Sequence, residues 1–167
     1  MIMSINTKEI ALFGLLGGLT FSAKVAMMGL PNIEPVTLMV MLFSVTFKKK
    51  AIYPIYIYVL LEFVLYGLNL WSINYLYVWA ILAIAAYLMK GMNNRFGWAL
   101  LAAAFGLLFG VFCAPVYAVV GGFSFARAWW INGIPFDLIH GISNFCIVFV
   151  LFNPLRYWLN KLYCEMD

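Results

Sequence analysis

The chain has 167 residues, of which 66% are hydrophobic and 10% are charged, and its formal net charge is +4. Its mean hydropathy of +1.01 is far above that of ordinary soluble domains, so the composition predicts an integral membrane protein. A spanning helix takes about 20 apolar residues, so about six such helices fill the chain and exclude an appended soluble domain.

Apolar runs, separated by Lys, Pro, Gly and Asn, succeed one another along the whole sequence. They predict six spanning helices, at about 9–29, 33–47, 51–69, 72–89, 96–120 and 134–153. The second run is short and has Pro35 near its start, so we expect it to be tilted or re-entrant rather than a full-length lipid-facing helix, with five spans as the alternative count. The predicted fold is all-α, an integral membrane bundle of six transmembrane helices in a single domain over residues 1–167.

The basic residues collect on one side of this arrangement. If six helices cross, eight of the ten basic residues fall at helix ends on the same side: Lys8, Lys48, Lys49, Lys50, Lys90, Arg95, Arg156 and Lys161. Lysine and arginine concentrate on the cytoplasmic side of membrane proteins, so we expect both termini to be cytoplasmic. Attraction to anionic lipid head groups then accounts for the net charge without nucleic acid.

The sequence lacks the residues that several classes of function require. The phosphate-binding pattern G-x-x-x-x-G-K-[ST] does not occur, so any ATP energy has to come from partner subunits. His140 is the single histidine, which removes the ligand pairs of most haem and zinc sites. Cys113, Cys146 and Cys164 lack the close spacing of a metal site. We therefore expect neither a metal nor a cofactor in this chain, and no enzymatic activity.

The first predicted helix has small residues at an interval of four: Gly14, Gly18, Ser22 and Ala26. The run 96–120 has a second such stripe: Ala102, Gly106, Gly110 and Ala114. Small side chains let another helix approach closely within the membrane. Each stripe therefore indicates either packing inside the bundle or, for the first stripe above all, docking of a separate membrane subunit.

Polar and aromatic side chains concentrate at the predicted outer ends of the helices. An interfacial belt needs only Trp and Tyr, so the carboxylates and amides among them require another explanation. Aromatic walls with a few convergent polar groups are typical of small-molecule sites. The candidate substrate-binding residues from these ends are Asn32, Glu34, Trp71, Asn74, Tyr75, Arg127, Trp130 and Asn132.

The last predicted helix adds Asp137, His140 and Asn144, whose spacing of three and four places them on one face. Ionisable groups within a span usually face a protein interior or an aqueous cavity, so we expect this face to line the binding site. The alternative is a structural cluster in which Asp137 accepts a hydrogen bond from His140 and Asn144 bonds a neighbouring helix.

Two further charges lie inside apolar runs. Lys24 either extends its stem to the outer interface or pairs with Glu34 across the short outer turn. Glu62, with Tyr66 and Asn69, keeps the spacing of one helical stripe and is a candidate for a second wall of the binding site.

With these features the chain resembles the substrate-binding S component of an energy-coupling factor (ECF) transporter, a family of bacterial and archaeal vitamin importers. The resemblance rests on the six-helix plan, the first small-residue stripe and the segment NGIPFDLIHGISNF (Asn132–Phe145) followed by FNPLRYWLNKL. The stripe is similar to the family's Ala-x-x-x-Ala docking motif, but has Gly14, Gly18 and Ser22 where alanines are usual.

This resemblance implies a multi-pass protein of the bacterial or archaeal cell membrane that binds a vitamin or related ring-bearing micronutrient near the outer surface. It also implies a complex with a coupling membrane subunit and two ATPase subunits, which use the ATP. The mixed charges of the candidate residues disfavour a purely anionic ligand. We expect the outer loop around Gly121, Gly122 and Ser124 to close over the ligand, because paired glycines permit large backbone movement.

Three other functions stay open at this point. A self-sufficient proton-coupled carrier would use Glu62, Asp137 and His140 as a relay, although such polar groups should then extend through the membrane depth. A membrane enzyme would use Asp137 and His140 as acid and base, but no nucleophile accompanies them. A purely structural membrane subunit would use the polar residues for packing.

Overall fold

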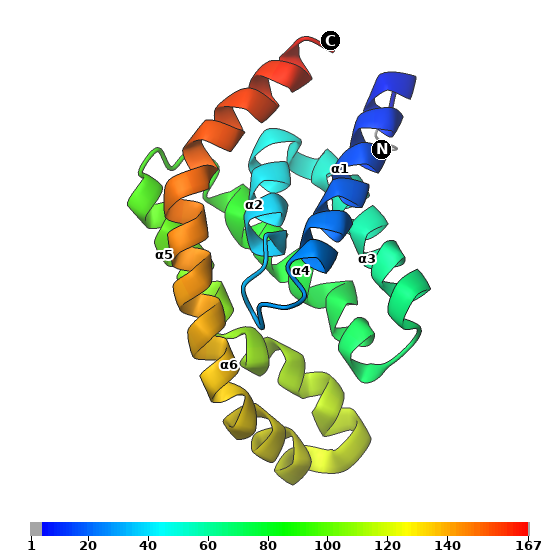
Figure 1. The fold of residues 1–167 in the computed structure, drawn as a ribbon, viewed down its shortest axis with the longest axis vertical. Coiled ribbons are helices and arrows are strands. Elements are labelled where there is room, and N and C mark those ends of the chain that lie inside the picture. The colour runs from blue at the N-terminus through cyan, green and yellow to red at the C-terminus, as the bar shows by residue number, and fades with distance from the viewer. Residues whose placement is uncertain (1–4, 167) are drawn as a thin grey trace.

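The computed structural model describes residues 5–166, and this part of the chain is helical, with no strand. The elements in chain order are α1 (Thr7–Ala26), α2 (Val36–Thr46), the short 3₁₀ turn η1 (Lys48–Ala51), α3 (Ile52–Tyr66), α4 (Leu70–Leu88), α5 (Arg95–Leu107) and α6 (Phe109–Cys164). Figure 1 shows them packed side by side in one bundle. The predicted all-α class is confirmed.

Asparagine caps start three of the helices. The side chain of Asn6 accepts a hydrogen bond from the Glu9 amide at the start of α1, and Asn94 caps α5 in the same manner. Asn69 caps α4, because α3 ends at Tyr66 and Gly67 turns the chain with a φ of 73°. The prediction that Asn69 continues the helical stripe of Glu62 is therefore wrong.

Three helical stretches of the described chain are long and apolar enough to cross a membrane, rather than the six predicted. They are Thr7–Ala26, Leu70–Leu88 and Arg95–Cys164. The helix α2 is apolar but has only 11 residues, and α3 has 15, because the chain turns earlier than the apolar runs indicate. Helices able to span a membrane are thus present, in smaller number than the sequence predicts.

The helix α2 lies inside the bundle, against α4 and α6. All of its residues except Met39 are buried. A helix that is apolar on every side belongs in an interior, and here neighbouring helices surround it. The prediction that the second run is not a full-length lipid-facing helix is confirmed.

The stretch Arg95–Cys164 contains a reversal of direction. Gly122 alone has non-helical backbone angles within α6, with φ at 79° and ψ at 172°, a conformation that glycine adopts readily. Two limbs of α6 therefore run side by side and meet at Gly122, the yellow turn at the bottom of Figure 1. The prediction of an outer loop around Gly121, Gly122 and Ser124 is wrong, because Gly122 alone connects the two helical limbs.

Both ends of the described chain lie at the opposite end of the bundle from the Gly122 turn (Figure 1). Lys8 Nζ donates to the Met166 carbonyl, and Lys50 and Tyr163 both bind the Glu9 carboxylate, with a shortest distance of 2.6 Å in each case. We call this end, which holds Lys8 and Lys50, the basic end, and the other end the turn end.

The two small-residue stripes have different surroundings. A Cβ at Gly106 would lie 2.7 Å from the Gly141 amide nitrogen, so the second stripe is used where α5 packs on α6. In α1 the contact with α3 goes through Gly17, where a Cβ would lie 2.9 Å from the Pro54 carbonyl oxygen. Positions 14 and 18 face open space, with no atom within 4 Å of an added Cβ.

Candidate ligand-binding site

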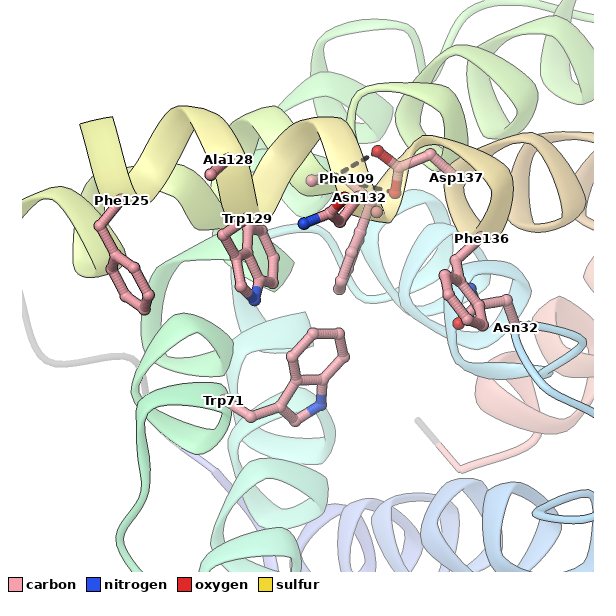
Figure 2. Close-up of a pocket in the computed structure, with 11 residues that line it drawn as sticks. Asn32, Trp71, Phe109, Phe125, Ala128, Trp129, Asn132, Phe136 and Asp137 are labelled. Carbon is pink, nitrogen blue, oxygen red and sulfur yellow. Dashed lines mark hydrogen bonds between the residues drawn. The ribbon is translucent and has the colours of Figure 1, made fainter. Parts of the chain in front are cut away.

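A cavity of about 440 Å³ opens between the α1–α2 connection, the start of α4 and both limbs of α6 (Figure 2). The loop and α4 each contribute one side chain to its wall, and the two limbs of α6 contribute the rest. The lining residues are Asn32, Trp71, Phe109, Gly110, Phe125, Ala128, Trp129, Asn132, Gly133, Phe136 and Asp137.

Aromatic rings in mutual contact form one wall of the cavity. The ring centroid of Trp71 lies 5.8 Å from that of Phe109 and 6.5 Å from that of Trp129. Trp129 is stacked on Tyr117 with 3.9 Å between centroids, and the indole nitrogen of Trp71 donates to the Tyr75 hydroxyl at 2.8 Å. These contacts hold flat apolar faces toward the open space, as Figure 2 shows for Trp71 and Trp129.

The most buried polar group of the lining is Asp137, which is 8% exposed. Both of its carboxylate oxygens lie 3.2 Å from the Gly110 amide nitrogen, the contact drawn as dashed lines in Figure 2. Gly110 is in the first turn of α6, after the break at Leu108, where amide groups lack helical partners and favour negative charge. A Cβ at position 110 would lie 2.5 Å from Asp137 Oδ2, so a larger residue there would displace the carboxylate.

The second limb of α6 presents one face to the cavity. Phe125, Trp129, Asn132 and Phe136 all line it, and their spacing of four, three and four is that of a single helical face. The sequence predicts a loop between residues 121 and 133, so Phe125 and Trp129 were not recognised as part of a helical face; Phe136, within the predicted helix 134–153, was not singled out either. The signal was available, because the same spacing can be read from the sequence once a helix is assumed.

Of the predicted substrate-binding residues, the cavity brings together Asn32, Trp71, Asn132 and Asp137. The other eight lie outside its lining: Glu34, Glu62, Asn74, Tyr75, Arg127, Trp130, His140 and Asn144. Arg127 is exposed, whereas Asn74 is buried and donates to the Leu70 carbonyl at 3.1 Å. Tyr75 lies behind Trp71, as its hydrogen bond to that indole requires.

Two contacts fasten the α1–α2 connection to α6 beside the cavity, and a third joins α2 to α6. His140 Nε2 lies 3.2 Å from Glu34 Oε1, and Ser143 Oγ donates to the Asn32 carbonyl at 2.9 Å. Asn144 Nδ2 lies 3.1 Å from the Thr37 hydroxyl in α2, so the predicted bond from Asn144 to a neighbouring helix is confirmed.

Asp137 and His140 have different partners from those expected for a structural cluster. The carboxylate of Asp137 accepts from the Gly110 amide, while His140 faces Glu34. The expected hydrogen bond between Asp137 and His140 is not among those of the described residues.

Lys24 pairs with a different carboxylate from the one considered. Its Nζ atom lies 2.5 Å from Glu62 Oε2, and Glu62 is 2% exposed. The lysine amine also lies 5.2 Å from the centroid of Tyr66 and 5.3 Å from that of Tyr75. The expected pairing with Glu34 is not observed, and Glu62 serves the α1–α3 contact rather than a wall of the cavity.

Residues 5–166 contain no group of three or more His, Cys, Asp or Glu side chains placed to hold a metal ion. The cavity therefore offers aromatic faces, two amides and one buried carboxylate as its recognition chemistry.

Comparisons with models of known protein families, with curated proteins and with solved structures found no match to this chain.

Proposed function

We propose that this chain is the substrate-binding S component of an ECF-type transporter, which binds a vitamin or related ring-bearing micronutrient for import. The observation that carries the proposal is the aromatic cavity of about 440 Å³ at the turn end of the bundle. Its size is that of a small-molecule site, and flat indole and phenyl faces are suited to a planar ligand. A coupling membrane subunit and two ATPase subunits would supply the energy.

The sidedness of the bundle supports this proposal. The proposed topology has both termini in the cytoplasm of a bacterial or archaeal cell, so that the basic end faces inward. The cavity lies toward the Gly122 turn, and Lys8 and Lys50 lie with the chain ends at the other end. A ligand would then enter from outside, as import requires.

The first small-residue stripe, on α1, supports the proposed coupling subunit as a partner. Gly14, Ser22 and Ala26 are exposed, and added Cβ atoms at Gly14 and Gly18 meet nothing. Small residues that no other part of the described chain covers allow a helix of a coupling subunit to approach closely. In the second stripe, by contrast, Gly106 is covered where α5 packs on α6.

The contacts of the ionisable residues favour binding over a proton-coupled carrier. A relay needs proton exchange among Glu62, Asp137 and His140. Each has a separate partner, since Glu62 pairs with Lys24, Asp137 accepts from the Gly110 amide and His140 faces Glu34.

The decisive measurement is native mass spectrometry of the protein purified from its own host in mild detergent. We expect a small-molecule adduct of vitamin size and, in part of the sample, a coupling subunit on the same particle. The variant Trp129→Ala should lose the adduct, because its ring forms much of the aromatic wall. A bare chain, even after a vitamin mixture is added, would contradict the proposal.

The partner is tested separately with Gly18→Leu. This variant should fold normally, because the side chain points into open space, and should no longer co-purify with a coupling subunit. Leu15→Ala is the matched control on the same helix, since Leu15 is exposed but lies outside the stripe. Equal co-purification of both variants would argue against docking through this stripe.

A further inference from the structure

The cavity contains one ionisable side chain. Asp137 is the single acidic or basic residue of the lining, and the other polar side chains there are the amides of Asn32 and Asn132. No lysine, arginine or histidine of the described chain lines the cavity. A ligand in contact with this wall therefore meets a carboxylate that no cationic side chain of the lining balances.

The charges around the cavity are balanced among themselves. Lys24, behind the Trp71 and Tyr75 rings, is neutralised by Glu62 at 2.5 Å. His140 faces Glu34 at 3.2 Å, so a proton on the imidazole has its own counter-charge. Asp137 has the Gly110 amide as its hydrogen-bond donor, which satisfies part of the carboxylate but brings no full positive charge.

The remaining surface of the cavity attracts cations as well. Five aromatic side chains line it: Trp71, Phe109, Phe125, Trp129 and Phe136. The face of an aromatic ring carries partial negative charge and attracts a cation within about 6 Å of it, more strongly when water is excluded. Figure 2 shows these rings arranged around the open space with Asp137 at its edge.

We infer that the ligand is an organic cation, with its positive nitrogen in or on an aromatic ring and directed toward Asp137. The inference rests on the proposed binding function and narrows its substrate class. An anionic ligand would approach a buried carboxylate, which is unfavourable in a site of low dielectric. A neutral ring would use the aromatic wall but would leave the carboxylate without a counter-charge.

A matched pair of probes tests the charge directly. Ring-N-benzylated nicotinamide is a pyridinium cation, and its dihydropyridine form has the same skeleton and no charge. Isothermal titration in mild detergent, at fixed ionic strength, gives a dissociation constant for each. We expect the cation to bind at least about tenfold more tightly, a difference of about 1.4 kcal/mol.

Two variants and a control locate the effect. Asp137→Asn keeps an acceptor for the Gly110 amide and removes the charge, so the cation should lose about tenfold in affinity while the neutral probe changes little. Asn132→Asp adds a second carboxylate at an exposed lining position that should not affect folding, and it should strengthen binding of the cation. Glu165→Gln, at the basic end, removes one carboxylate far from the cavity and should leave both dissociation constants unchanged.

The outcomes separate this inference from the function on which it rests. Equal affinity for both probes, tighter binding of the neutral form or no binding of either overturns the cationic class. A native adduct that is neutral or anionic and is lost in Trp129→Ala also overturns it, yet supports the binding function. If no adduct of any kind forms, the binding function itself fails.

Discussion

His140 of α6 and Glu34 of the α1–α2 connection meet across the bundle, with 3.2 Å between Nε2 and Oε1. Glu34 also accepts from the Val36 amide at 2.5 Å, so the same carboxylate caps α2 and anchors the connection to α6. The segment that contributes Asn32 to the cavity is therefore held in place by a side chain far away in the sequence.

We expect His140→Leu to loosen this connection without unfolding α2, because Glu34 keeps its contacts with the first turn of that helix. The rate of amide hydrogen exchange in residues 28–33 should increase by about tenfold or more, because the unrestrained connection opens locally more often. Cys146→Ala, at an exposed position on the same helix, is the control. Unchanged protection in His140→Leu would show that the contact does not restrain the loop.

Replacing Lys24 should reduce stability more than replacing its ion-pair partner Glu62. Lys24→Met leaves a carboxylate with only 3% of its side chain exposed and no cation, so we expect a loss of about 3 kcal/mol in the free energy of unfolding. Glu62→Gln leaves the lysine, whose side chain is 21% exposed and can reach a polar surface along its stem, so its loss should be smaller.

Thermal unfolding of both variants in mild detergent measures this difference. The double variant Lys24→Met/Glu62→Leu should recover much of the loss, because an apolar pair often replaces a buried ion pair at little cost. A double variant as unstable as Lys24→Met alone would contradict this account.

The choice of partner for Lys24 illustrates what the sequence could not supply. Glu34 and Glu62 were both available in the sequence, and the decision between them depends on which helix packs against α1. That packing is set by Gly17, which lets α3 approach its backbone closely. Charge and hydropathy identify the residues that need partners, but the partners come from contacts between distant segments.

The cavity was partly predictable for a similar reason. Helical spacing placed Asp137 correctly on an inward face, and the aromatic and amide residues at the helix ends indicated a ligand site. The part of the face made by Phe125 and Trp129 was missed because the segment after the glycine pair was interpreted as a loop. A single residue with positive φ reverses the chain at Gly122, and hydropathy carries no information on how short such a connection is.

The buried Tyr58 and the half-buried Tyr77 should respond differently to loss of their hydroxyl groups. The Tyr58 hydroxyl is buried and has no hydrogen-bond partner within the described part of the chain. The Tyr77 hydroxyl lies 2.8 Å from the Phe112 carbonyl oxygen and 2.9 Å from Asn74 Oδ1. A buried polar group without a partner is unfavourable, so Tyr58→Phe should leave the free energy of unfolding unchanged or raise it. Tyr77→Phe should lower the free energy of unfolding by about 1 kcal/mol, because two hydrogen bonds are lost.

Unfolding midpoints measured side by side under identical detergent conditions test this pair of variants. A large loss in Tyr58→Phe would mean that its hydroxyl has a partner, such as an internal water molecule. No loss in Tyr77→Phe would mean that the contact between α4 and α6 contributes little.

Glycine substitutions should separate the stripe used inside the bundle from the stripe on its surface. In Gly106→Ala the new methyl group would lie 2.7 Å from the Gly141 amide nitrogen and 2.8 Å from its Cα, and a backbone cannot move aside as a flexible side chain can. The two helices must separate, so we expect the free energy of unfolding to fall by about 1 to 3 kcal/mol or more, as in other overpacked cores.

Gly14→Ala places the same methyl group in open space and should be neutral or slightly stabilising, because alanine favours the helix. Unfolding midpoints give the comparison, and equal stability of the two variants would mean that α5 and α6 do not pack as closely as their backbones indicate.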